Sequence, residues 1–361
     1  MSSSTVSPAT TFMGNALPPL QRHVWPPVPT YDGLPPAFDE FLRLSYAQQQ
    51  QHLATLRNDP DGQARYDETL HRFLSVVSAY LFGYDDSPTF RRTDDALEMA
   101  ILQAKMVCER ELLDHWLTVD RHPTGMDQRE AAEYLLRLRD DNPCVGHPLF
   151  DYIERDASRR AITMFLRNEV TRNEVVDDEV AMMLVGLQGP MKLAISSNLW
   201  DECGRGKLTN FHTYWLRRLL EHTSDWDDLL RYRGVRPWFT QITTNVFNIL
   251  LTRPGIRMMA YGWFLINESW VAPHFEKILT GIRRVGLDTD DVTVYFAAHV
   301  TIDPRHTDEL TGAIAVQQPP LSPAETDLVV RGAHLAIAAN KAQYDRMAGY
   351  LTELTEGGRK E

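Results

Sequence analysis

The sequence predicts an all-α protein, and three features carry that prediction. Apolar residues recur at intervals of three and four along most of the chain beyond residue 36, which is the spacing of one helical face. In residues 94–119 this stripe consists of Leu97, Ala100, Ile101, Ala104, Val107, Cys108 and Leu112. Turn signals separate the periodic stretches, and no run of any length alternates apolar and polar residues as a strand does.

Ten helices are expected, each a periodic stretch between turn signals. Pro123-Thr-Gly125 and Asn142-Pro143 separate the second, third and fourth of them. Gly204-Arg-Gly206, Pro254-Gly255 and Pro319-Pro320 separate later ones. The expected helices cover about residues 62–83, 94–119, 127–140, 147–172, 177–200, 207–222, 236–253, 257–284, 288–312 and 322–354.

The first residues differ in composition from the rest of the chain. They are rich in Ser, Thr and Pro and contain Pro26, Pro27, Pro29, Pro35 and Pro36. Such a segment has too few apolar residues to pack, so we expect it to be extended or disordered. A polar stretch with a proline, residues 140–148, is the best boundary further along. We therefore predict an extended segment over 1–36, a helical arm over 37–144 and a compact helical domain over 145–361.

Composition excludes several classes of protein. The 361 residues carry a formal net charge of −12 with scattered Lys and Arg, whereas a nucleic-acid-binding protein needs a basic stripe. Three distant cysteines, Cys108, Cys144 and Cys203, form neither a disulfide framework nor a CxxC zinc site. The N-terminus lacks the pattern of a signal peptide, and no apolar run approaches the roughly 20 residues of a membrane span. We expect a cytoplasmic protein that binds neither nucleic acid nor a membrane.

The sharpest local signal is His299-Val-Thr-Ile-Asp303-Pro-Arg-His306. Positions i, i+4 and i+7 lie on one helical face, so two imidazoles and a carboxylate point the same way. Iron accepts both ligand types. Asp303-Pro304 also suits a helix N-cap and first turn. In that alternative a new helix begins at 303 and His299 belongs to the preceding one.

Two further signals involve carboxylates. Glu202 and His212 flank the Gly204-Arg-Gly206 bend, although each also suits an ordinary helix end. Glu268 lies within the apolar and aromatic stretch Tyr261–Val271. A carboxylate there is costly to bury unless a cation pairs with it, and a metal ion or a buried Arg would serve equally well.

Together these segments resemble the haem-oxygenase-like diiron oxidases, also described as iron-containing redox enzymes. Members of that family carry a Glu-x-Gly-x-Gly run with a His ten residues after the Glu, a Glu on a later apolar helix and an HxxxDxxH. The corresponding residues here are Glu202, Gly204, Gly206, His212, Glu268, His299, Asp303 and His306. The resemblance covers residues from about 145 to 355 and implies a seven-helix haem-oxygenase-like bundle.

The resemblance also implies the chemistry. Two Fe ions would cycle between Fe²⁺ and Fe³⁺, with O₂ as co-substrate and a peroxo-diiron(III) intermediate. The implied metal ligands are Glu202, His212, Glu268, His299, Asp303 and His306, and Glu169 is a runner-up ligand. Glu202 and His212 would share one iron, Glu268 and Asp303 the other, and the sequence leaves open which His of the last motif serves which iron. No catalytic residue beyond these ligands is expected.

Substrate and partners follow from the same resemblance. We expect a small amino acid or carboxylic acid as substrate and an electron donor as partner; the oligomeric state stays open, a homodimer included. N-oxygenating members tend to carry a carboxylate three residues before the first metal-binding His, where this chain has Thr209. This favours desaturation or oxidative cleavage of an aliphatic, amino-acid-like substrate. The alternatives are an N-oxygenase and a metal-free helical binding protein with a degenerate fold.

Overall fold

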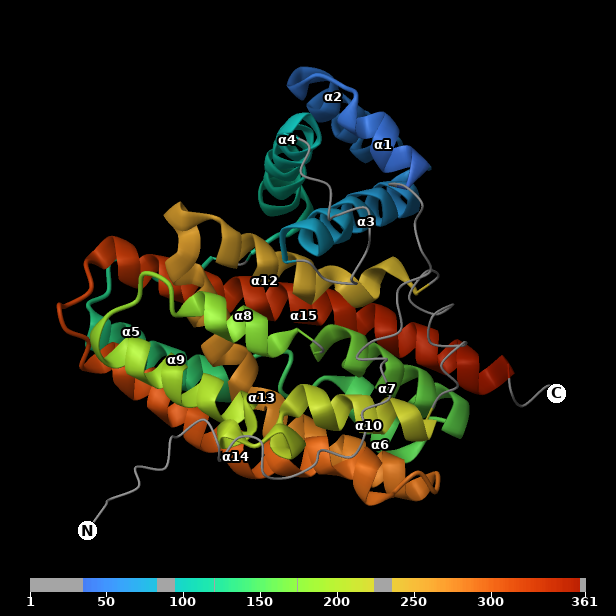
Figure 1. The fold of residues 1–361 in the computed structure, drawn as a ribbon, viewed down its shortest axis with the longest axis vertical. Helices are drawn as coiled ribbons and strands as arrows, with labels where there is room; N and C mark the ends of the chain where they lie inside the picture. Colours follow the sequence, from blue (N-terminus) through green and yellow to red (C-terminus); the bar gives the residue numbers. More distant parts are fainter. Residues whose placement is uncertain (1–34, 83–94, 120, 174, 224–235, 358–361) are drawn as a thin grey trace, which may run out of the picture.

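The computed structural model describes residues 35–82, 95–119, 121–173, 175–223 and 236–357. These residues form helices joined by loops, and none of them lies in a strand. Figure 1 shows long helices packed side by side, with a smaller group of N-terminal helices at one end. The prediction of an all-α fold is confirmed.

The helices follow one another closely in the chain. The N-terminal group consists of α1 (Pro36–Leu42), α2 (Tyr46–Arg57), α3 (Gln63–Phe82) and α4 (Asp95–Glu111). The remaining helices are α5 (Gln128–Asp140), α6 (Pro148–Arg155), α7 (Arg159–Asn173), α8 (Val176–Met183), α9 (Gly189–Glu202), α10 (His212–Thr223), α12 (Ile242–Thr252), α13 (Arg257–Arg284), α14 (Asp290–Ala315) and α15 (Pro323–Gly357). No helix in the described part of the chain is both long enough and apolar enough to cross a membrane.

Helix α13 lies at the centre of the bundle, because it packs along both α14 and α15. A pair of glycines permits a close crossing with α15. A Cβ atom on Gly262 would lie 1.8 Å from the carbonyl oxygen of Val329, and one on Gly332 would lie 1.9 Å from that of Met259. Any larger side chain at either position would push the two helices apart. This contact fixes how far α13 lies along α15 and which of its faces points toward α15. Helix α13 carries Glu268.

Two apolar clusters fill the bundle, and a polar layer separates them. One cluster contains the first half of α13 and the end of α14, and the other contains the second half of α13 and the beginning of α14. Between them lie polar residues of α13, α14 and α15. His299, Asp303, His306 and Asn340 are buried, and Glu268 is half-buried. Buried polar groups need partners, so this layer is where a ligand or metal site is expected.

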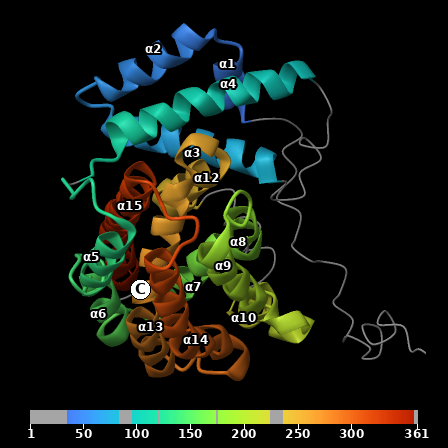
Figure 2. The same ribbon diagram turned by 90° about the vertical axis from the view of Figure 1, so that its left-hand side faces the viewer.

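The N-terminal helices extend the first apolar cluster. Helix α3 packs against α12, and α4 packs against α2 and α3, so that α1, α2 and α4 lie beyond α3 when seen from the bundle (Figures 1 and 2). Helix α5 instead packs against α14 and α15 within the bundle. Of the segment predicted to be extended, residues 1–34 lie outside the described residues, and α1 begins at Pro36. The predicted domain boundaries at 36 and 144 remain predictions.

Some helices differ from those expected. The stretch 147–172 is divided into α6 and α7, and 177–200 is divided into α8 and α9. The second break coincides with Gly186 and Gly189, whose φ angles of +87° and +56° are left-handed and incompatible with a continuous helix. Helices α1 and α2 were not predicted by the periodicity.

Pro304 lies inside α14, which runs unbroken from Asp290 to Ala315. The alternative in which a new helix begins at Asp303 is therefore wrong. His299, Asp303 and His306 share one helix, and all three side chains are buried. A proline in a helix interior costs one backbone hydrogen bond, and the packing of α14 against α13 and α10 compensates for it.

Candidate metal centre

Four helices of the bundle supply the six residues singled out by the sequence. Glu202 is the last residue of α9, His212 the first of α10, and Glu268 lies midway along α13. His299, Asp303 and His306 lie on α14, which packs against α9, α10 and α13. The structure brings the six side chains together as two groups of three.

The glycine-containing bend brings Glu202 and His212 face to face. Gly204, Arg205 and Gly206 all have left-handed φ angles, of +57°, +53° and +78°, which turn the chain sharply at the end of α9. A Cβ atom on Gly204 would lie 2.4 Å from the backbone carbon of Asn210. Only glycine permits this approach, so the Glu-x-Gly-x-Gly pattern has a structural cause.

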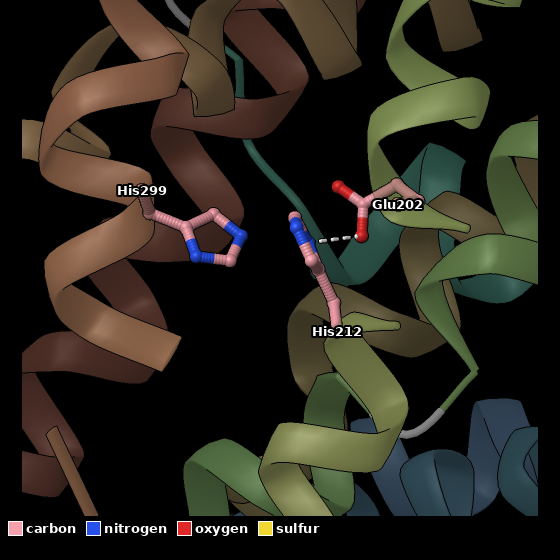
Figure 3. A group of neighbouring side chains, drawn as sticks. All are labelled: Glu202, His212 and His299. Carbon is pink, nitrogen blue, oxygen red and sulfur yellow. Dashed lines mark ion pairs between the residues drawn. The ribbon is translucent and has the colours of Figure 1, made fainter. Parts of the chain in front are cut away.

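The first group consists of Glu202, His212 and His299. One potential ligand atom from each lies within 4.8 Å of the others, and Figure 3 shows the three side chains turned toward one another. Oε2 of Glu202 and Nδ1 of His212 are 2.6 Å apart, yet the geometry is not that of a hydrogen bond and both atoms lack any hydrogen-bond partner. The two atoms are at ion-pair distance, and a metal ion bound between them would satisfy both buried groups.

The backbone sets the orientation of His299. Its Nδ1 lies 2.7 Å from the carbonyl oxygen of Tyr295, one turn earlier on α14. Because a carbonyl only accepts hydrogen bonds, Nδ1 carries the proton and Nε2 carries the free lone pair. A histidine that binds a metal through one ring nitrogen commonly donates a hydrogen bond from the other ring nitrogen to a carbonyl oxygen.

The second group consists of Glu268, Asp303 and His306. Nδ1 of His306 lies 3.2 Å from Oε2 of Glu268 and 3.6 Å from Oδ1 of Asp303. Oδ2 of Asp303 is buried and has no hydrogen-bond partner. Two carboxylates and one imidazole therefore surround a second point, and the donor set again suits iron.

Asp201 is a further residue of the site that the sequence did not reveal. Its Oδ2 lies 3.0 Å from Nε2 of His306, and the same carboxylate accepts hydrogen bonds from Arg205 and Arg305. The side chain is 4% exposed. Its position directly before Glu202 was the one available signal, because neighbouring residues at a helix end can face the same site.

Burial sets the direction of the pKa shift for His299, Asp303 and Glu268. For Glu202 and His306 the oppositely charged neighbours outweigh burial, so that the pKa of Glu202 is lowered and that of His306 is raised. Burial lowers the pKa of His299 to about 3, so this imidazole is neutral near pH 7. Burial, together with the carboxylates of Glu268 and Glu202, raises the pKa of Asp303 well above its usual range. Burial also raises the pKa of Glu268. Carboxylates that destabilise one another in this way would be stabilised by a bound cation.

A cavity of about 130 Å³ adjoins both groups. Its lining includes Glu202, Glu268, His299 and Asp303, and much of the remainder is aromatic. A molecule in this cavity would be in contact with residues of both groups. The cavity is thus the natural position for a substrate.

Glu169 and Thr209 have different positions from those the sequence suggested. Glu169 lines the cavity but belongs to neither group. Thr209 is exposed on a 3₁₀ turn, where its hydroxyl is 3.5 Å from Oδ1 of Asn210. A side chain at position 209 therefore faces solvent, and the interpretation that it controls a coordination position is not supported by this geometry.

One family of known proteins matches this part of the chain by sequence. Residues 163–341 match the family described as iron-containing redox enzyme. This region belongs to that family. All six residues of the two groups lie within the matched region, so the resemblance inferred from sequence is confirmed. Among curated proteins, no sequence matches the chain significantly.

Two solved structures resemble the chain at low sequence identity. A CADD-like protein of unknown function from Nostoc punctiforme PCC 73102 matches with 14% identity and a TM-score of 0.50, over 62% of this chain and 97% of that one. A domain of unknown function with a heme oxygenase-like fold from Shewanella denitrificans OS217 has 14% identity and a TM-score of 0.46, over 64% and 96% of the two chains. The haem-oxygenase-like fold predicted from the sequence is confirmed.

Proposed function

We propose that the protein is a non-haem diiron oxidase that uses O₂. The observation that carries the proposal is the pair of buried groups, each with three potential ligands, inside a region that belongs to the iron-containing redox enzymes. Three carboxylates and three imidazoles form a donor set that suits Fe²⁺ and Fe³⁺ alike. Unbonded ligand atoms in each group support the assignment.

Each group would hold one iron. Glu202, His212 and His299 would bind the first, and Glu268, Asp303 and His306 the second. In this proposal His299 joins Glu202 and His212, and His306 joins Glu268 and Asp303, a choice that the sequence left open. When bound, two Fe²⁺ ions would supply electrons for the reduction of O₂.

The residues of this chain would set the geometry and exclude water. Hydrogen bonds to the Tyr295 carbonyl and to Asp201 hold His299 and His306 in one orientation each, which keeps the ligand lone pairs in place. Trp263 and Trp270 line the cavity and are almost completely buried. They would keep bulk water from the reacting atoms and hold a substrate against both groups.

For the reaction, we propose desaturation or oxidative cleavage of a small aliphatic, amino-acid-like substrate. The modest volume of the cavity supports a small substrate, and its contact with both groups would place a carbon chain close to the oxidant. N-oxygenation of an amine is the competing reaction. It would require the nitrogen, rather than a carbon, to face the two groups.

Oxygen consumption and product mass test the proposal together. Protein loaded anaerobically with Fe(II) is mixed with O₂ and small amino acids, and the products are analysed by mass spectrometry. We expect O₂ uptake and a product that has lost two hydrogens or has been cleaved. A hydroxylated or nitro nitrogen would identify an N-oxygenase. Failure to bind iron at all would contradict the oxidase proposal and favour a metal-free binding protein.

A further inference from the structure

Glu169 on α7 carries a carboxylate outside both groups, and the residue lines the same cavity. Its carboxyl group is enclosed by protein atoms, although the residue as a whole is only half-buried. Within the described residues, no side chain donates a hydrogen bond to this carboxylate or lies at ion-pair distance from it. Burial raises its pKa to about 7.

Arg172 is the cation that acts on Glu169, and it already has a carboxylate of its own. Nη1 of Arg172 lies 2.9 Å from Oε2 of Glu179. Glu179 is completely buried and does not line the cavity. A buried carboxylate needs its ion pair, so the charge of Arg172 is committed to Glu179.

The remaining charges of the cavity are those of the two groups. Metal ions bound there would offset the carboxylates of Glu202, Glu268 and Asp303. Arg172 also lines the cavity, but its ion pair is with Glu179. Among the described residues, Glu169 would then be the cavity carboxylate without an ion pair of its own. A buried carboxylate in this position is costly unless a cation enters beside it. A substrate ammonium group would provide that cation.

A second polar group of the cavity is oriented by its neighbour. Oε1 of Gln343 accepts hydrogen bonds from the backbone nitrogen and the hydroxyl of Thr243, at 3.2 and 3.1 Å. Both residues line the cavity. Because the oxygen of the Gln343 amide is occupied, the amide offers its NH₂ as a donor. An oxygen atom of a substrate would accept from it.

The volume limits the size of the molecule. About 130 Å³ is slightly less than the roughly 150 Å³ cavity that accommodates benzene. A compound of about six non-hydrogen atoms fits, whereas a long-chain fatty acid does not. Phe247, Trp263, Phe264 and Phe275 would contact its carbon atoms.

We propose that this cavity binds a small aliphatic compound through a protonated amine that pairs with Glu169, while Gln343 donates a hydrogen bond to an oxygen atom of the same compound. This inference rests on the proposed diiron function, because it assigns the substrate of that site. An amine held by Glu169 leaves the carbon atoms to contact the two groups. The arrangement favours oxidation at carbon over oxidation at nitrogen.

Calorimetry with three compounds of similar size tests the proposal. n-Butylamine, 2-aminobutyric acid and butyric acid are titrated into the metal-free protein and into the anaerobic Fe(II)-loaded protein, and bound iron is counted for each variant. We expect both amines to bind at least tenfold more tightly than butyric acid. Glu169→Gln should reduce amine affinity at least tenfold without changing the iron content. Glu133→Gln, an exposed carboxylate on α5, is the matched control and should change nothing.

Other outcomes overturn the proposal. Equal binding of butyric acid, unchanged amine affinity in Glu169→Gln, or no binding of either amine would each contradict it. Loss of an iron from Glu169→Gln would show that Glu169 is a metal ligand instead. The diiron proposal is judged separately, by the iron content of the wild-type protein, so failure of one proposal is distinguishable from failure of the other.

Discussion

Asp201 and His306 form a carboxylate–imidazole pair that leaves one ring nitrogen for a metal ion. Oδ2 of Asp201 lies 3.0 Å from Nε2 of His306, whereas Nδ1 of the same ring faces Glu268 at 3.2 Å. Burial opposes ionisation of Asp201, but hydrogen bonds from Arg205 and His306 outweigh it and lower the pKa of Asp201 to about 2. The carboxylate is therefore charged at neutral pH and fixes the proton on Nε2.

Asp201→Asn removes this charge and should weaken the second iron site. Loss of such an outer partner costs about 10–100-fold in metal affinity, and we expect that loss at the His306 group only. Anaerobic Fe(II) titration measures the two affinities. Asp308→Asn, at an exposed position on α14, is the control. Two tightly bound irons in Asp201→Asn would show that Asp201 does not support the site.

Gly204→Ala should separate Glu202 from His212. Gly204 has a φ angle of +57°, which disfavours any residue with a side chain. A Cβ atom at this position would also lie only 2.4 Å from the backbone carbon of Asn210. We expect a loss of about 1–3 kcal/mol in the free energy of unfolding and loss of the first iron. Gly125→Ala has a similar φ of +76° but no atom within 4 Å. Thermal unfolding and iron analysis should show a smaller loss of stability and full iron content for this control.

Thr209→Glu should leave the iron content and the product unchanged. The side chain at 209 is exposed on the turn before α10, so a carboxylate there would be solvated and would not reach either group. Iron analysis and product mass provide the test. If Thr209→Glu changed the product, the turn that carries residue 209 would have to move toward the site when the protein binds iron.

The stability of the metal-free protein should fall as the pH rises above about 6.5. Burial raises the pKa values of Asp303 and Glu268, so the folded chain binds more protons than the unfolded chain. The free energy of unfolding then decreases as pH rises through the folded pKa values. The lowered pKa of His299 acts in the opposite direction, but only below its unfolded value of 6.5.

Thermal unfolding between pH 6.5 and about 8 measures this effect. We expect Tm of the metal-free protein to decrease over that range, and saturation with Zn²⁺ to reduce the decrease because the cation stabilises both carboxylates. The substitution Asp303→Asn should also make the decrease of Tm with pH smaller in the metal-free protein. A Tm that rises with pH in the metal-free protein would contradict the assignment of raised carboxyl pKa values.

The sequence predicted those parts of the structure that depend on the spacing of residues within one helix. The i, i+4, i+7 spacing of His299, Asp303 and His306 was sufficient because one continuous helix carries all three. Helix α2 was missed because its glutamine-rich sequence has weak amphipathicity, and one of its buried residues is Gln49.

Relationships between helices could not be read from spacing. Asp201 meets His306 only because α9 packs against α14, and the division of the two histidines between the groups depends on the same packing. The position of Thr209 on an exposed turn, rather than on a helix that faces the site, likewise depends on the left-handed bend before it.

Stoichiometric titration of the protein with Fe(II) under anaerobic conditions tests the central claim most directly. Two buried groups predict two equivalents of bound iron per chain in the wild-type protein. His212→Ala and His306→Ala should each bind one equivalent, because each removes a ligand from a different group. A single equivalent or none in the wild-type protein, or the same two equivalents in both variants, would contradict the account.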